Sequence, residues 1–134
     1  MSDSAATPYA FTKLVVHDLE GMRDFYENVY GLREFDRVKA AIGGQPIDEI
    51  MLGVDSGFGP GSLILLQFVG APAPTPGAII LGFVTSDLDD LVDRVVRHGG
   101  SVHEAPSKSE AAPVRVAFVR DPEGNLTECV QMLE

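Results

Sequence analysis

The sequence predicts an α+β fold in which a βαβββ unit (one strand, one helix and three further strands) occurs twice in tandem. Strand-like and helix-like segments follow the same order in both halves of the 134-residue chain. A proline-rich stretch, 70–76, separates the halves. Residues 64–67 (Ile-Leu-Leu-Gln) fall at the same place in the first half as residues 128–131 (Glu-Cys-Val-Gln) in the second. The alternative interpretation is an unrelated α+β sheet with two helices.

The first module covers about residues 11–69. Residues 11–17 are rich in β-forming side chains, which predicts a short strand. Asp18 then caps a helix that ends at Gly31, and apolar side chains recur on one face of it, namely Met22, Phe25, Tyr26 and Val29. The remaining elements are strands at 33–38, 46–54 and 62–69, a turn at 43–44 and a glycine-rich loop at 57–61.

The second module covers about residues 77–132 and follows an extended linker, because the alternating prolines of 70–76 favour a stiff, polyproline-like chain. A strand is predicted at 77–84, and residues 86–89 resemble a capping box at the start of a helix. The buried face of that helix is predicted to carry Leu88, Leu91, Val92, Val95 and Val96, and the helix to end at 99–100. The remaining elements are strands at 101–104, 114–120 and 126–132, a loop at 105–113 and a tight turn at 121–124. The two modules together are expected to form one domain over residues 1–134.

The composition is that of a globular protein, with 45% hydrophobic and 22% charged residues. The 20 acidic and 10 basic residues leave a net charge of −10, which the two halves share equally. Since the sequence has no basic run or tail, we expect neither nucleic acid nor an anionic membrane as a partner. Residues 56–86 carry no charge, but prolines and glycines interrupt them, so we expect no membrane span.

Cys129 is the only cysteine, which excludes an intrachain disulfide and a cysteine-based zinc site. Its thiol is expected to be packed and to face away from Glu128. Residues 1–9 lack the charged-then-apolar pattern of a secretory signal. We therefore expect a cytoplasmic enzyme or binding protein.

Three stretches of the sequence are typical of one known family. Residues 11–32 contain Asp-Phe-Tyr and end in Gly-Leu, residues 87–100 contain Asp-Leu-Asp-Asp-Leu and His-Gly-Gly, and residues 118–128 contain an Asp-Pro-Glu-Gly turn followed by a glutamate. On these motifs the chain resembles the vicinal oxygen chelate superfamily, which includes glyoxalase I, extradiol dioxygenases and bleomycin-resistance proteins. The resemblance covers residues 11–132. It implies two curved half-barrels around a small-molecule cavity, and a homodimer formed either side by side or by exchange of modules through 70–76.

The resemblance also implies where a metal would be held. The metal enzymes of the family bind one divalent ion through four residues, whose positions match Phe11, Ile64, Ala78 and Glu128 here. Three of these side chains are apolar, and a single carboxylate does not hold a catalytic ion tightly. The spacing of the three histidines, His17, His98 and His103, does not replace the missing ligands. We therefore expect no metal site and no cofactor.

Alternation along the predicted strands defines a candidate ligand cavity. If Phe11 points inward, the inward-facing residues are Phe11, Lys13, Val15, Ile64, Leu66, Phe68, Ala78, Ile80, Gly82, Val116, Phe118, Leu126, Glu128 and Val130. This cavity is apolar, with Lys13 and Glu128 as its polar groups. It suits a small apolar or amphipathic molecule.

Glu128 is the candidate acid or base, because a carboxyl group buried without a partner is suited to exchange a proton. Alternatively, Glu128 is a family relic satisfied by Lys13, by backbone or by water. Lys13 either lies inside with a ligand or with Glu128, or packs its stem on the rim. Three functions follow: metal-independent binding of a small molecule, isomerase or lyase chemistry at Glu128, and metal-dependent glyoxalase or dioxygenase activity with displaced ligands. The loss of three metal ligands favours the first two.

Overall fold

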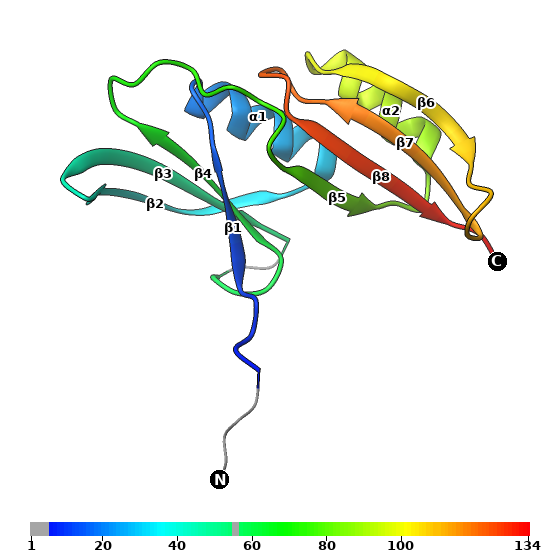
Figure 1. Cartoon of the computed structure of the whole chain (residues 1–134), viewed down its shortest axis with the longest axis horizontal. Coiled ribbons are helices and arrows are strands. Elements are labelled where there is room, and N and C mark those ends of the chain that lie inside the picture. Colours follow the sequence, from blue (N-terminus) through cyan, green and yellow to red (C-terminus); the bar gives the residue numbers. More distant parts are fainter. Residues whose placement is uncertain (1–5, 55–56) are drawn as a thin grey trace, which may run out of the picture.

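The computed structural model describes residues 6–54 and 57–134 and contains two βαβββ modules, as the sequence predicts (Figure 1). Module one consists of β1 (Phe11–Val15), α1 (Leu19–Tyr30), β2 (Arg33–Ile42), β3 (Gln45–Gly53) and β4 (Ser62–Phe68). Module two consists of β5 (Ile80–Val84), α2 (Leu88–Arg97), β6 (Ser101–Lys108), β7 (Val114–Arg120) and β8 (Leu126–Met132). Neither helix in these described ranges combines the length and apolar character needed to cross a membrane. The expectations for residues 1–5 lie outside the described residues.

Each module forms its own four-stranded sheet. Sheet A has the order β1-β4-β3-β2, and sheet B has the order β5-β8-β7-β6. In both sheets the first strand of the module pairs in parallel with the last, with Phe11 opposite Ser62 and Ile80 opposite Leu126. β1 and β5 are therefore edge strands at equivalent places. Figure 1 shows both helices on the same side of the two sheets.

One hydrophobic core is shared by the two helices and by one face of each sheet. Leu14 and Leu65 of sheet A and Cys129 of sheet B belong to this core, together with the apolar faces of α1 and α2. The aromatic side chains of α1 reach the second module, where the Tyr30 ring stacks on Phe83 with centroids 3.8 Å apart. Each fully buried apolar side chain of the core contributes roughly 1.5–3 kcal/mol, and the partly buried Tyr30 and Phe83 pack against that core. The shared core therefore joins the two modules into one unit.

The Asp-Pro-Glu-Gly turn between β7 and β8 contacts the start of α1 in the other module. The Glu123 carboxylate accepts hydrogen bonds from the backbone N–H groups of His17 and Asp18, over 2.6–3.0 Å. Asp18 caps α1 as predicted, because its carboxylate accepts the Gly21 N–H at 3.1 Å. A carboxylate is favourable here, since the first N–H groups of a helix lack partners within the helix. This turn thus positions α1 against sheet B.

Two strands extend beyond their predicted ends because pairing with a neighbour continues. β2 runs to Ile42 rather than to residue 38, since the two-residue turn at 43–44 carries the pairing with β3 through the hairpin. β6 runs to Lys108 rather than to residue 104, and an irregularity in its register with β7 accommodates Pro106. The predicted loop at 105–113 is correspondingly shorter.

Two elements of module two begin at other residues than predicted. β5 begins at Ile80 rather than at residue 77, because Gly77 adopts a φ of 116°, which a strand does not have. α2 is capped by Asp87 rather than by Ser86, and the Asp87 carboxylate accepts the Asp90 N–H at 3.1 Å. The strands predicted at 114–120 and 126–132 are confirmed at both ends.

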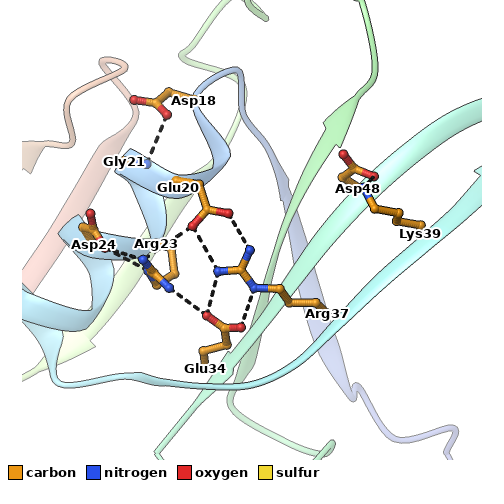
Figure 2. A network of polar contacts seen from close by, with 9 residues as sticks. All are labelled: Asp18, Glu20, Gly21, Arg23, Asp24, Glu34, Arg37, Lys39 and Asp48. Atoms are coloured by element: carbon orange, nitrogen blue, oxygen red, sulfur yellow. Dashed lines mark hydrogen bonds and ion pairs between the residues drawn. The ribbon is translucent and has the colours of Figure 1, made fainter.

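Charged side chains tie α1 to β2 across the surface of module one (Figure 2). Arg37 of β2 contacts both Glu20 of α1 and Glu34 on its own strand. Arg23 of α1 donates to Glu34 at 2.9 Å. The hydrogen bond from Arg37, together with that from Arg23, holds the pKa of the Glu34 carboxyl below its ordinary value despite the opposing effect of burial. The network fixes the helix over the outer part of sheet A.

Candidate functional site

The face of sheet A that is turned away from α1, here called the distal face of sheet A, carries the ligand-binding residues predicted for module one. Cross-strand pairing places on it Phe11, Lys13, Val15, Ile47, Glu49, Met51, Ile64, Leu66 and Phe68. Ile64 and Leu66 are buried although they lie outside the core shared with the helices. On β1, β4 and β3 this face is therefore largely apolar, with Glu49 as its acid and Lys13 as its base, while Asp36 of β2 lies opposite Met51 nearer the edge of the sheet.

That acid and that base, Glu49 and Lys13, form an ion pair across β4. Lys13 lies on β1, and its Nζ is 2.6 Å from Oε2 of Glu49 on β3. The Glu49 side chain is only 4% exposed, whereas that of Lys13 is 35% exposed. At this distance the ammonium group and the carboxylate oxygen are in direct contact, and their charges compensate each other. Glu49 is thus a nearly buried acid whose charge is paired with a partly exposed base.

The sequence analysis considered Glu128 as a partner for Lys13, and the structure shows a different one. The ammonium group meets Glu49, and not Glu128, which lies on sheet B. Glu49 was missed as a site residue. Alternation along the predicted strand 46–54 would have placed it on one face with Ile47 and Met51. What the sequence does not reveal is that this face is the one that carries Lys13.

The distal face of sheet B, turned away from α2, carries the residues predicted for module two. Pairing across β5, β8 and β7 places on it Ile80, Gly82, Leu126, Glu128, Val130, Val116 and Phe118. Glu128 is half-buried and lies between Gly82 and Phe118. A Cβ atom added to Gly82 would meet nothing within 4 Å. Open space therefore lies beside the strand that carries the carboxylate.

Ala78 does not occupy the position in β5 that matches Phe11 in β1. Phe11 lies two residues before Lys13, which is opposite Ile64. In module two, Ile80 lies two residues before Gly82, which is opposite Glu128. The equivalent of Phe11 is therefore Ile80, and the sequence alignment was displaced by two residues. Ala78 instead precedes β5 and lines a small pocket of about 190 Å³ together with Lys13 and Val15.

Within a single chain, the predicted site residues lie on two separate surfaces, the distal faces of sheet A and sheet B. Those of sheet A and those of sheet B lie on separate sheets that share no strand pairing among the described residues. Phe11 and Ile80 both line a crevice of about 330 Å³ between the edge strands β1 and β5, which Tyr9 and Thr12 also line. That both distal faces contribute to one cavity stays a prediction.

The residues at the positions matched to the family's metal ligands do not fit a divalent ion. With the corrected register, these positions hold Phe11, Ile64, Ile80 and Glu128, so they supply one carboxylate and three hydrocarbon side chains. An ion of this kind needs several nitrogen, oxygen or sulfur donors. Elsewhere in the described parts of the chain, no three histidine, cysteine, aspartate or glutamate side chains are grouped to hold a metal.

Two tandem βαβββ modules, each with an apolar distal face on its sheet, define a protein of the glyoxalase-like class. The chain belongs to the Glyoxalase/Bleomycin resistance protein/Dioxygenase superfamily, whose sequence profile matches residues 9–129. This confirms the family that the sequence motifs indicate.

Solved structures agree with the fold. A glyoxalase family protein from Bacillus cereus superposes with a TM-score of 0.82 over 100% of this chain and 99% of its own, at 20% identity. The trypanothione-dependent glyoxalase I of Leishmania major gives a TM-score of 0.74 over 94% and 87% of the two chains, at 19% identity. Identities this low establish the shared fold and leave the activity open.

A curated relative matches part of the chain more closely. A virulence protein of Salmonella typhimurium is 38% identical over 64 residues. The match spans 46% of this chain and 44% of the length of that protein. The similarity to this relative is therefore limited to less than half of either chain.

Proposed function

We propose that this protein binds a small apolar or amphipathic molecule on the distal faces of its sheets, and that it does so without a metal ion. The observation that carries the proposal is the distal face of sheet A, where a partly exposed Lys13 is paired with a nearly buried Glu49 among the apolar residues Ile64 and Leu66. Apolar side chains with a few placed polar groups are the usual lining of a small-molecule site. Sequestration of the ligand is the simplest activity for such a site.

The donor set supports the metal-independent form of this proposal. Glu128 is the one oxygen donor among the four matched positions, and the nearly buried acid of sheet A, Glu49, is paired with Lys13. A bound ion would need ligands from outside these positions. A tightly bound ion would also stabilise the folded chain by mass action.

The test combines elemental analysis with native mass spectrometry of the purified protein. We expect less than stoichiometric nickel, zinc, iron or manganese, and no change in melting temperature on addition of a chelator. We expect native spectra to show a co-purified organic molecule that is lost under denaturing conditions. One metal ion per chain that is lost with the Glu128→Ala substitution would overturn the metal-independent proposal and favour a glyoxalase or dioxygenase with displaced ligands.

A metal-independent isomerase or lyase is the second candidate, and the space beside Glu128 favours it. Gly82 opposite this carboxylate leaves room for a substrate atom to approach. A positioned carboxylate contributes to catalysis as a general acid or base. In an enzyme, Glu128→Gln should remove turnover and spare binding. In a binding protein, the same substitution should alter affinity alone, and unaltered binding and stability would make Glu128 a relic of the family.

A further inference from the structure

We infer that Lys13 and Glu49 form a charge-balanced anchor for an uncharged ligand that carries a hydrogen-bond acceptor oxygen, such as a ketone, ester or amide. This inference rests on the proposed function and names the chemical class of the ligand. It assigns recognition to a pair of residues on β1 and β3, away from Glu128 and from the positions matched to metal ligands.

The exposure of the pair decides which partner meets the ligand. The Glu49 side chain is only 4% exposed, so a ligand on the distal face does not reach its carboxylate first. The Lys13 side chain is 35% exposed and is therefore the accessible member of the pair. An ammonium group has three N–H donors, and Glu49 lies next to only one side of it. The remaining donors are available to an acceptor oxygen.

The surroundings of the ammonium group are apolar and aromatic. Its Nζ lies 5.9 Å from the centre of the Phe11 ring. The Phe11 ring in turn packs against Phe58, with centroids 4.8 Å apart. Cross-strand neighbours of the pair are Ile64 and Leu66, both buried. A ligand oxygen that meets Lys13 would therefore belong to a molecule with an apolar, planar or branched body.

Charge balance selects an uncharged ligand. Lys13 and Glu49 neutralise each other at 2.6 Å, and the flanking side chains Ile47, Ile64 and Leu66 carry no charge. A carboxylate or a sulfonate placed beside the pair would leave one uncompensated negative charge in an apolar site, and an amine would leave one positive charge. Either is costly, because burial removes the water that solvates a charge. A neutral acceptor adds a hydrogen bond and leaves the charge balance unchanged.

The burial of Glu49 points to the same conclusion. Moving a carboxylate out of water is costly, so a buried ion pair stabilises a fold little compared with apolar side chains. The charge of Glu49 instead holds the Lys13 ammonium group beside the apolar residues of the distal face. Glu49 is thus the positioning residue, and Lys13 is the residue that touches the ligand.

Three fluorescent probes test the inference by equilibrium titration. Prodan is a neutral naphthyl ketone whose emission shifts to longer wavelength when its carbonyl accepts a hydrogen bond. N-phenyl-1-naphthylamine is neutral and has no oxygen, and 1-anilinonaphthalene-8-sulfonate is an anion. We expect the wild-type protein to bind both neutral probes, prodan more tightly than the sulfonate.

Substitution of Lys13 should weaken binding of the ketone probe, prodan, and should not weaken binding of the oxygen-free probe. Lys13→Met should weaken prodan binding about tenfold, as expected for a hydrogen bond from a charged donor, and should shift the emission of bound prodan to shorter wavelength. Binding of N-phenyl-1-naphthylamine should change less than about twofold, because this probe has no oxygen to accept a hydrogen bond from Lys13. Lys39→Met is the matched control, because Lys39 also pairs with an acid of β3, Asp48 at 3.0 Å, but is 85% exposed. It should leave all three affinities unchanged.

Removal of the acid should reverse the charge preference. Glu49→Gln leaves Lys13 as an uncompensated cation, so affinity for the sulfonate should rise about tenfold relative to prodan. If Lys13→Met fails to fold because Glu49 is left unpaired, the double substitution Lys13→Met/Glu49→Met removes both charges and should show the same loss of prodan binding. Circular dichroism checks the fold of every variant.

Two results would overturn the inference. Prodan affinity that is unchanged by loss of Lys13, while N-phenyl-1-naphthylamine still binds, would remove the anchor and leave the proposed function standing. Stronger binding of the sulfonate than of prodan by the wild-type protein would reject charge balance as the basis of selection. Failure of every probe to bind the wild-type protein, with no co-purified molecule in native spectra, would instead reject the proposed function itself.

Discussion

Tyr26 of α1 donates a hydrogen bond from Oη to Oδ2 of Asp121, across 2.8 Å and 95 residues of sequence. Asp121 is 3% exposed, and its carboxylate also accepts from the backbone N–H of Glu123, the backbone N–H of Asn125 and the Asn125 side chain. Burial and the Asp121 charge together raise the pKa of Tyr26 well above its ordinary value, so the phenol stays a donor. The most specific family motif of the sequence, the Asp-Pro-Glu-Gly turn, thus connects module two to α1 of module one through this hydrogen bond.

We predict that Tyr26→Phe destabilises the protein by about 1.5–3 kcal/mol, the range for a hydrogen bond to a charged group. The substitution leaves Oδ2 of Asp121 with the Asn125 side chain as its remaining donor. Urea unfolding followed by circular dichroism measures the change. Tyr30→Phe is the control on the same helix, because the Tyr30 hydroxyl contacts the neutral Cys129 thiol at 3.8 Å and not a carboxylate. Equal losses in both variants would contradict a specific role for the hydrogen bond to Asp121.

The α1–β2 network predicts a loss of stability in acid. The pKa of Glu34 is lower in the folded chain than its ordinary value of 4.5, chiefly through the hydrogen bond from Arg37. A folded-state pKa below the unfolded value means that the contribution is complete above about pH 4.5 and is lost as the pH falls through the folded pKa. Solvent screens this network, so the contribution of Glu34 stays below about 1 kcal/mol.

Glu34→Gln should therefore lower the free energy of unfolding at pH 7 and change it little at pH 3. Thermal melts of both proteins over this pH interval measure the difference. Asp24→Asn provides a control, since Asp24 contacts only Arg23 and is 60% exposed. A deficit of Glu34→Gln that is as large at pH 3 as at pH 7 would show that charge is not its cause.

Cys129 should be unreactive in the folded protein. Its side chain is fully buried in the shared core, and burial raises the pKa of its thiol above the ordinary value. Since the thiolate is the reactive form, both effects oppose modification. Ellman's reagent should release no colour from the native protein and one equivalent from the protein in urea. Rapid labelling of the native protein would contradict the position of Cys129 in the core.

We predict a homodimer of closed two-fold symmetry whose interface includes the edge strand β5. Ile80 and Val84 of the edge strand β5 are 54% and 73% exposed. Apolar side chains that gather on an exposed sheet edge are typical of an interface. Light scattering at micromolar concentration should give twice the chain mass, and Val84→Lys should shift the equilibrium toward the monomer. Val96→Lys should leave the dimer intact, because Val96 of α2 is 55% exposed and, contrary to the sequence prediction, does not belong to the buried face of that helix. A wild-type monomer would reject this prediction.

The sequence was sufficient to predict the order of elements, the two modules and the family. Asp18 and Gly31 bound α1 as predicted, and the apolar spacing of Met22, Phe25, Tyr26 and Val29 identified its buried face. These features are local, because a cap, a glycine and a helical period each act within a few residues. Alternation likewise separated Cys129, which faces the core, from Glu128, which does not.

Only the tertiary structure decided which residues of different strands face one another. Alternation assigns each residue to one of two faces, but it does not say which face meets the helix or how far neighbouring strands are shifted. For that reason Ala78 was aligned in place of Ile80, and Lys13 was compared with Glu128 while its ion-pair partner is Glu49. The register of β1, β4 and β3 is set by side chains packed across the whole sheet. The anchor that the pair Lys13–Glu49 provides is a property of that register and cannot be derived from either strand alone.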